Sequence, residues 1–403
     1  MPVLFICLLL FLGASPSSSS AELAPEVAVR VFSGRQITAC TVVSESKLRV
    51  GSMATECTGG AFEVPPGEVV KVTADGDKIR VASPEIGSAP AADKWEFSAS
   101  TPITITLERG PTRSYRGRVV VTAREGCLAF VNRVPLEDYL PGVLPAEIPA
   151  EAHPEALKAQ AIAARTYALA NLGKHRAEGF DLCDTSHCQV YVGAGAENPR
   201  CTAAVKDTEG VIVTYDGKPI HAVYHDTCGG RTAGNETAWR GSEPLPYLRP
   251  VADGENGVAW CARSPRAVWT RQLSQAKLGS ALARLGVNGP VTKIEPAEGD
   301  ENGRPKQYRV GTANGESVIV AGVLRAALNN ALGWDTIPSA DFEAAPNGDS
   351  MVFAGRGNGH GVGLCQWGAN AMAKAGKTAE EILKHYYQGV TVERRMWPRR
   401  EQN

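Results

Sequence analysis

The chain has 403 residues, of which 43% are hydrophobic and 21% are charged, and its formal net charge is -1. This composition excludes a disordered protein and leaves room for two domains with sizeable cores. The small net charge provides no overall attraction to nucleic acid or anionic lipid, so we expect no nucleic-acid partner. Any polymer that the protein handles should be recognised by shape and hydrogen bonds.

Residues 1–20 are typical of a secretory signal peptide. An apolar run from Val3 to Leu12 precedes small residues and a serine tract, and the run is too short to span a bilayer. No later stretch approaches transmembrane length. We therefore expect an exported protein of the periplasm or cell envelope, with no transmembrane segment in the mature chain.

Residues 21–114 predict a small β-rich region of unassigned role. Alternating apolar and polar side chains occur in the segments VAVRVFS, EVVKVTA, KIRVAS and PITITLE, which are separated by Gly, Pro, Asp and Ser. No cluster of reactive side chains occurs among them. The region is interpreted as a packing or positioning module.

The clearest helix begins at Pro154 and is ended by Gly173. A narrow stripe of small side chains at helical spacing favours close packing against a neighbour. The stripe consists of Leu157, Ala161, Ala164, Ala168 and Leu172. Arg165 lies off that stripe, where it could face solvent or a cleft. Near the C-terminus, Thr378 and Glu381 predict a capping box that opens another helix.

Residues 355–373, GRGNGHGVGLCQWGANAMA, have glycine at every second position from Gly355 to Gly363. If this run is extended, Arg356, Asn358 and His360 share one face, and the opposite face has no side chains. The spacing fits no phosphate-binding glycine motif. A mobile surface loop is the alternative, since glycine by itself indicates only backbone freedom.

Nine cysteines follow the predicted signal peptide. In an exported protein they predict disulfides, and their odd number leaves at least one thiol free or bound to metal. Cys183, His187 and Cys188, with His175 upstream, offer ligands suited to tetrahedral zinc. A disulfide between Cys183 and Cys188 is an equal alternative. Four protein ligands would make such a zinc structural and not catalytic.

Five segments occur in order within residues 115–395. They are VPLEDYLPGVLPAEIP, EALKAQAIAARTYAL, DTSHCQVY, HDTCGGRTAGNETAW…YLRPV and GRGNGHGVGLCQWGANAMAKAG…EILKHYYQGV. In order and approximate spacing they resemble the SpoIID/LytB domain of the stage II sporulation protein D family. The resemblance implies an α+β fold, with a mixed β-rich core and a few helices lining a glycan-binding cleft, preceded by the small β-rich region.

Members of that family are lytic transglycosylases that cut peptidoglycan between N-acetylmuramic acid and N-acetylglucosamine, preferring strands stripped of stem peptides. The resemblance therefore implies such an enzyme, with glycan strands as its partner and no cofactor required for catalysis. Other members are amidase enhancers, so the alternative is a non-catalytic wall-binding protein that stimulates a cell-wall amidase. Some members bind zinc in the region that matches the Cys/His cluster.

The family's catalytic acid matches Glu147 in the segment LPAEIP. Pro145 and Pro149 disfavour a regular helix there, and apolar neighbours would raise the carboxyl pKa by desolvation, as a general acid requires. Glu155 falls in the first turn of a helix, where the dipole explains its charge, and Glu151 lies in a polar loop.

One carboxylate suffices if the muramic acid's own C6 hydroxyl is the nucleophile, because that group is already tethered to the reacting ring. The resemblance implies that several side chains bind glycan. These are Arg356, Asn358, His360, Gln366, Arg165, Gln189 and Tyr191. For His360 a purely structural hydrogen bond is the alternative. Trp367 would add a stacking face, whereas Cys228 stands where serine is usual, which weakens any claim for a hydroxyl role.

Overall fold

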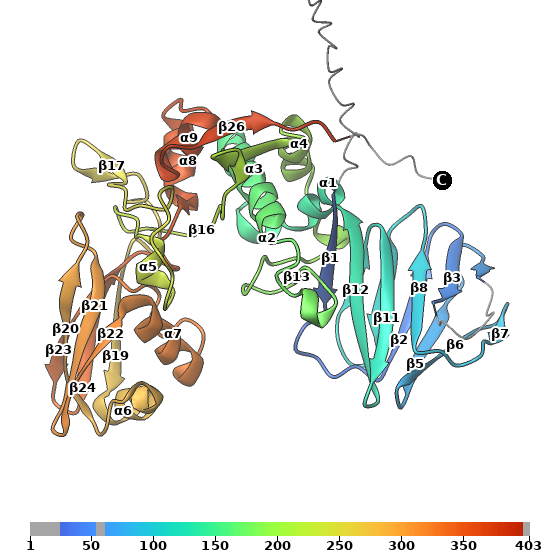
Figure 1. The fold of residues 1–403 in the computed structure, drawn as a ribbon, viewed down its shortest axis with the longest axis horizontal. Coiled ribbons are helices and arrows are strands. Elements are labelled where there is room, and N and C mark those ends of the chain that lie inside the picture. The colour runs from blue at the N-terminus through green and yellow to red at the C-terminus, as the bar shows by residue number, and fades with distance from the viewer. Residues whose placement is uncertain (1–24, 54–60, 398–403) are drawn as a thin grey trace, which may run out of the picture.

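The structure is a computed structural model that describes residues 25–53 and 61–397. The predicted signal peptide lies outside the described residues. Figure 1 shows a β-sandwich at the right, a helical part at the centre and a second β-rich lobe at the left. This mixed, β-rich α+β architecture confirms the predicted fold class. In the described ranges, no helix combines the length and apolar character needed to cross a membrane.

Two sheets form the β-sandwich. The first has the strand order β13 (Leu182–Cys183), β1 (Glu26–Val31), β12 (Cys127–Pro135), β11 (Arg118–Arg124), β8 (Lys94–Ser98), β3 (Leu48–Ser52) and β4 (Phe62–Val64). The second has the order β10 (Thr112–Tyr115), β9 (Ile103–Leu107), β2 (Ala39–Ser44), β5 (Val70–Asp75), β6 (Lys78–Ser83) and β7 (Gly87–Ser88). Buried and partly exposed residues alternate along β12 and β8, as expected for strands with one face against a core.

The sandwich crosses the predicted boundary between residues 114 and 115. β11 and β12 follow that boundary, yet they pair with β8 and β1, which precede it. One hydrophobic core extends from Val27 in β1 to Val390 near the C-terminus, through the sandwich and the helices. The structure therefore does not separate the β-rich region from the part that follows it, because strands from both complete the same sheet.

The central part is built around the long helix α3 (Pro154–Ala170), which is buried on nearly all sides. It contacts several helices and a short sheet. These elements are α1 (Leu136–Tyr139), α2 (Leu144–Glu147), α4 (Pro199–Asp207), α8 (Gln366–Lys374), α9 (Ala379–Tyr386), β14 (Val211–Tyr215), β15 (Lys218–Pro219) and β26 (Thr391–Arg394). The predicted capping box is present at the start of α9. Short 3-10 turns complete this part, η1 (Leu140–Gly142), η2 (Arg176–Glu178) and η3 (Ala194–Ala196).

The second lobe lies inside the predicted catalytic domain and has its own core, formed by buried residues between Trp269 and Phe353. Two three-stranded sheets and two helices enclose it. They are β19 (Val268–Ser274), β24 (Ser350–Arg356), β23 (Phe342–Asn347), β20 (Val291–Gly299), β21 (Pro305–Thr312), β22 (Gly315–Val320), α6 (Gln275–Leu282) and α7 (Ala321–Leu332), with the turn η4 (Ala283–Leu285).

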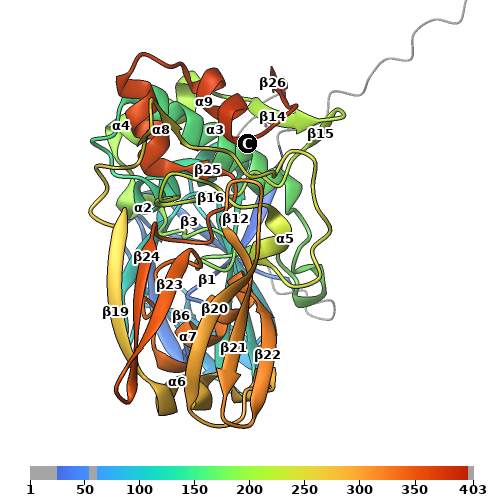
Figure 2. The ribbon, with the colours of Figure 1, turned by 90° about the vertical axis from the view of Figure 1, so that its left-hand side faces the viewer.

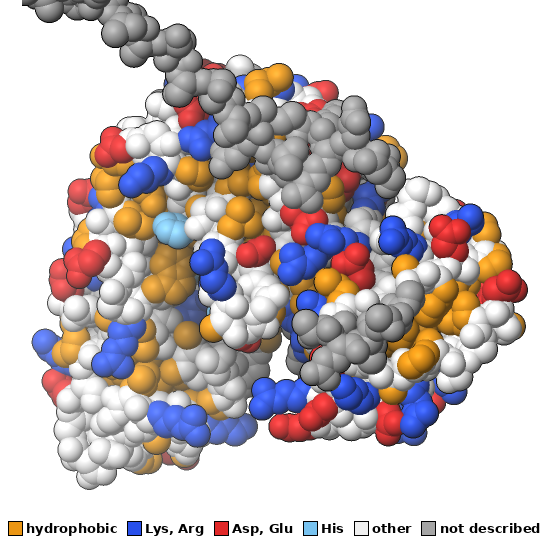
Figure 3. All heavy atoms as spheres, turned by 45° about the vertical axis from the view of Figure 1, so that its right-hand side comes forward, with side chains coloured by type: hydrophobic (Ala, Val, Ile, Leu, Met, Phe, Trp, Pro, Cys, Tyr) orange, Lys and Arg blue, Asp and Glu red, His pale blue; other side chains and the backbone are white. Residues whose placement is uncertain are grey.

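Short elements connect this lobe to the helices. They are β16 (Tyr224–His225), α5 (Asn235–Ala238), β17 (Gly254–Glu255), β18 (Val258–Ala259) and β25 (Leu364–Cys365). β16 and β25 pair in parallel above the lobe, beneath α8 and α9 (Figure 2). In the space-filling view a notch opens downward between the lobe and the sandwich (Figure 3).

Candidate functional site

Glu147 is the last residue of α2, a single helical turn that precedes α3. Ile148 is extended and ends the turn, so the helix stays short, as its flanking prolines predict. The Glu147 side chain is partly buried, and the Val190 N–H donates to its Oε1 at 2.9 Å. Burial raises the carboxyl pKa, opposed by hydrogen bonds from Val190 and the Tyr224 hydroxyl. The net shift is upward, which confirms the predicted direction.

Tyr224 in β16 is a functional candidate that the sequence reasoning missed, although it directly precedes a family segment. Its hydroxyl bonds the Glu147 carboxyl and accepts from the Gln189 Nε2 at 3.2 Å. Gln189 in turn donates to the Ala164 carbonyl at 3.2 Å and accepts from the Tyr139 hydroxyl at 3.3 Å. Gln189 is only 1% exposed, so its predicted contact with glycan is not supported. It positions Tyr224, which positions the acid.

Arg165 and Tyr191 are also buried. The Arg165 guanidinium pairs with both carboxylate oxygens of Glu137 at 2.8 Å, because α3 is covered on the side where this arginine points. The Tyr191 hydroxyl donates to Asn132 Oδ1 at 2.8 Å, inside the core. Their burial and internal partners do not support the prediction that Arg165 and Tyr191 bind substrate, and favour structural roles for both.

The glycine run is not extended beyond Arg356, where β24 ends. Its next four alternating glycines all have φ between 69° and 104°, in the left-handed region. A Cβ at Gly357 would meet the backbone of Thr227 and Cys228, and a Cβ at Gly363 would meet the Val223 carbonyl. The predicted bare face for a glycan is therefore wrong, because the protein's own backbone occupies that space.

Four predicted binding residues of this run have different environments. Arg356 is exposed, whereas Asn358 donates to Asp226 Oδ2 at 2.8 Å. Gln366 is 9% exposed and points to Gln160, so its direct contact with a glycan is not supported. The fourth, His360, is partly buried.

The His360 ring is held by backbone groups. Its Nδ1 accepts from the Val362 N–H at 3.1 Å, and the ring also bonds the Tyr224 backbone. Burial lowers its pKa to about 4, so the ring is neutral near pH 7. These contacts favour the structural alternative for His360. Trp239 lies beside it, with ring centroids 5.2 Å apart, and is 40% exposed.

The predicted Cys/His cluster is assembled at the edge of the sandwich. The candidate ligand atoms of His175, Cys183, His187 and Cys188 all lie within 4.8 Å of one another. Sulfur–nitrogen distances are 3.4 Å between Cys188 and His175, 3.5 Å between Cys188 and His187, and 3.6 Å between Cys183 and His187. Tetrahedral zinc with ordinary bond lengths places such atoms roughly 3.6 Å apart, so the residues fit this metal.

An acidic residue supports one of these histidines. The Glu178 Oε1 lies 2.7 Å from His175 Nδ1, on the ring nitrogen away from Cys188. A carboxylate in this position orients a metal-binding histidine. Every cysteine in the described ranges is free, so the predicted disulfides, including Cys183 to Cys188, are not formed there. Cys57 lies outside the described residues.

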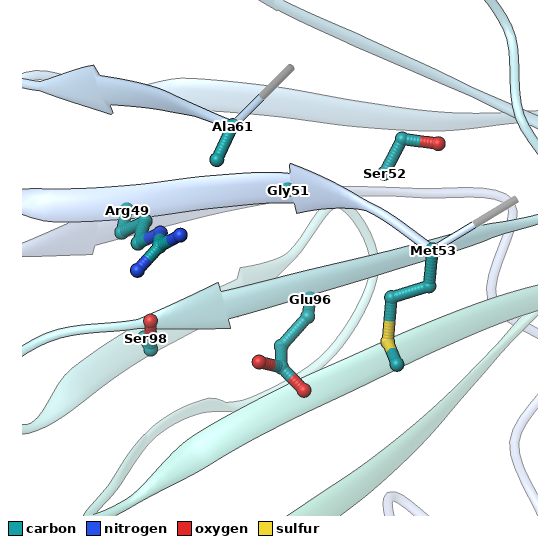
Figure 4. Close-up of a pocket in the computed structure, with 7 residues that line it drawn as sticks. All are labelled: Arg49, Gly51, Ser52, Met53, Ala61, Glu96 and Ser98. Atoms are coloured by element: carbon teal, nitrogen blue, oxygen red, sulfur yellow. The ribbon is translucent and has the colours of Figure 1, made fainter. Parts of the chain in front are cut away.

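A surface pocket of about 280 Å³ lies away from these groups, on β3 and β8 of the sandwich (Figure 4). It is lined by Arg49, Gly51, Ser52, Met53, Ala61, Glu96 and Ser98. None of the residues that hold Glu147 lines it. The pocket is therefore separate from the candidate active site.

Comparison with known proteins places this geometry in a family. The family model described as stage II sporulation protein matches residues 124–215. Stage II sporulation protein D of Bacillus subtilis (strain 168) is 33% identical over 337 residues, covering 79% of this chain and 87% of that protein. The Bacillus amyloliquefaciens protein of the same name is 36% identical over 281 residues, covering 65% and 75%.

A protein named amidase enhancer, from Bacillus subtilis (strain 168), is 30% identical over 298 residues. That match covers 63% of this chain and 40% of the enhancer. The matched family model includes Glu147 and the Cys/His cluster, and the longest of these alignments covers most of both chains. The chain therefore belongs to the stage II sporulation protein D family.

Proposed function

We propose that this protein is an exported cell-wall enzyme, a lytic transglycosylase that cuts peptidoglycan glycan strands between N-acetylmuramic acid and N-acetylglucosamine. The observation that carries the proposal is the Glu147 carboxyl, which is partly accessible, raised in pKa by burial, and aimed by the Val190 N–H and the Tyr224 hydroxyl. An upward shift of the carboxyl pKa is the direction that a general acid requires.

In the proposed reaction, Glu147 first donates its proton to the glycosidic oxygen as the bond from that oxygen to C1 of muramic acid breaks. The resulting carboxylate then takes the proton of the C6 hydroxyl while the C6 oxygen bonds C1. The products are a free N-acetylglucosamine hydroxyl and a 1,6-anhydro end. Glu147 regains its proton, and no water is consumed.

The surroundings of Glu147 support a mechanism with one acid. Hydrolysis with inversion needs a second carboxylate to activate water. Among the described residues, no other carboxylate contributes to the pKa shift of Glu147. Glu137, an acid of the neighbouring helix α1, is engaged by the buried guanidinium of Arg165. An internal hydroxyl nucleophile removes the need for a second acid.

Exposed groups near the Tyr224 segment supply the proposed glycan contacts. Arg356 can donate to sugar hydroxyls and carbonyls, and Trp239 offers an exposed ring face for stacking on a sugar. Asn358 can contribute if substrate competes for its bond to Asp226. His360 holds this surface in place through the Tyr224 and Val362 backbone.

The products distinguish the proposed enzyme from its alternative. We expect the mature protein to release fragments from denuded glycan strands whose muramic ends are lighter by one water than hydrolytic ends, as mass spectrometry would show. Hydrolytic reducing ends would contradict transglycosylation. The similarity to the amidase enhancer supports an alternative function, stimulation of a cell-wall amidase. If the glycan stays intact while an added wall amidase releases stem peptides faster, the protein is a non-catalytic enhancer.

We also propose a structural zinc held by His175, Cys183, His187 and Cys188. The residues Gln189 and Val190, which support the acid, follow Cys188 directly, so a metal here would fix the segment that holds Glu147. Such a zinc supplies no chemistry to the reaction, since four protein ligands leave no position for water.

The expected result is that Cys188→Ser lowers the zinc content of protein purified without added metal by about one ion per chain. Elemental analysis of the intact variant and the parent protein measures this difference. Cys127→Ser is the matched control, because this partly buried cysteine in β12 lies outside the cluster. An unchanged zinc content in Cys188→Ser would contradict the site.

A further inference from the structure

We infer a second structural zinc site, formed by Cys228, Asp253, Cys261 and Cys365. Their candidate ligand atoms all lie within 4.8 Å of one another. All four residues are fully buried. Cys228, Asp253 and Cys261 lie in three separate loop segments, and Cys365 ends the short strand β25. This inference does not depend on the proposed enzymatic activity.

The distances within this Cys3Asp cluster suit a metal better than a disulfide. The Cys228 and Cys261 sulfurs are 3.5 Å apart, and the Cys228 sulfur is 2.9 Å from Asp253 Oδ2. A disulfide brings its sulfurs to about 2.05 Å. Two thiolates on tetrahedral zinc lie roughly 3.8 Å apart, close to the spacing seen here.

Backbone N–H groups converge on the sulfurs. The Cys228 and Gly368 N–H groups each donate to the Cys365 sulfur at 3.3 Å, and the Gly230 N–H donates to the Cys228 sulfur at 3.2 Å. Gly368 is in the first turn of α8, whose dipole also favours negative charge at Cys365. N–H donors of this kind stabilise thiolates, the form in which cysteine binds zinc.

Cys261 supplies the third sulfur of the cluster. Its side chain is fully buried, and its sulfur lies within 4.8 Å of the candidate ligand atoms of the other three residues. A cation at the centre can therefore form three metal–sulfur bonds.

The carboxylate of Asp253 is oriented by its own partners. Its Oδ1 accepts from the Tyr386 hydroxyl at 2.8 Å and lies 3.2 Å from His385 Nε2, both in α9. Oδ2 is directed to the Cys228 sulfur. Outer hydrogen bonds that fix one oxygen while the other faces the ligand cluster are typical of a metal-binding carboxylate. A divalent cation would also offset the cost of burying this negative charge.

The place of the cluster gives the zinc a structural role. Cys365 ends β25, which pairs with β16 so that Tyr224 lies beside Leu364. Cys228 lies three residues beyond the end of β16. A zinc joining Cys228 to Cys365 would therefore hold together the two strands that place Tyr224 against Glu147, while the Cys/His cluster holds the segment on the other side of the acid.

Zinc stoichiometry in the parent protein and its variants tests the inference. The intact mature protein, purified without added metal, is expected to hold about two zinc ions per chain. Cys188→Ser and Cys261→Ser should each hold about one, and the double variant none, by elemental analysis. Cys127→Ser should match the parent. Asp253→Asn, which preserves side-chain shape, should release zinc to a chelator faster than the parent.

Two results would overturn the inference. One is a parent protein that holds about one zinc ion per chain, all of which is lost in Cys188→Ser. This result can be obtained even if Cys261→Ser does not fold. The other is a disulfide between Cys228 and Cys261, mapped by peptide mass spectrometry without reduction. If only the Cys/His site is assigned wrongly, Cys188→Ser keeps the parent's zinc whereas Cys261→Ser loses it. The two proposed zinc sites can therefore be disproved independently.

Discussion

Glu147→Gln is expected to abolish release of anhydro-ended fragments from denuded glycan, with a loss of at least roughly 10²–10⁴-fold in rate, the contribution of a positioned general acid. The amide cannot donate the proton that the leaving oxygen needs, nor accept one from the C6 hydroxyl. It can still accept from the Val190 N–H through its carbonyl, so the fold should remain. Product release followed by mass spectrometry measures the loss.

Glu151→Gln is the matched control, since Glu151 is an exposed acid only four positions along the chain. It should cleave glycan at the parent's rate. Near-parental turnover in Glu147→Gln would remove Glu147 from the mechanism. Glu137 and Asp138 would then be the first acids to test.

The pH dependence gives a second readout on the same carboxyl. The Tyr224 hydroxyl stabilises the ionised form of Glu147 and so lowers its pKa, against the larger upward effect of burial. Tyr224→Phe removes that hydroxyl, so the pKa should rise further. Because a general acid works in its protonated form, the alkaline limb of the kcat/KM profile should move to higher pH. Tyr215→Phe, a partly buried tyrosine in β14, should leave the limb in place.

Arg165→Met is expected to destabilise the protein by about 3 kcal/mol, at the low end of the cost of removing one partner of a buried ion pair, because Glu137 is partly exposed. The guanidinium is fully buried, pairs with Glu137 through two hydrogen bonds, and also donates to the carbonyls of Val205 and Val211. Methionine fills much of the volume but satisfies none of these acceptors. The shift of the urea unfolding midpoint measures the effect.

Arg35→Met serves for comparison, because Arg35 is exposed. This substitution should change the free energy of unfolding by no more than about 0.5 kcal/mol. If Arg165→Met unfolds at the parent's urea concentration but binds glycan weakly, the structural assignment of Arg165 is wrong and the original expectation of a substrate contact returns.

The sequence by itself determined features that short-range patterns encode. Helical spacing after Pro154 predicted α3, and Thr378 with Glu381 predicted the cap of α9, because both depend on residues within a few positions. The short turn at Glu147 follows from its flanking prolines. Residue types alone indicated a metal-binding cluster at residues 175–188, whose cysteines and histidines are close enough in sequence to come together.

Only the tertiary structure decided which groups face one another across long stretches of chain. Periodicity places Arg165 on a face of α3 but does not show that α1 covers that face and brings Glu137 to it. Alternating glycines indicate close backbone approach, yet the approaching backbone is the protein's own, which residues 223–228 supply. Tyr224 meets Glu147, and Cys228 meets Cys365, through folding of distant segments. Such contacts are set by packing of whole elements, which leaves no local periodic signal in the sequence.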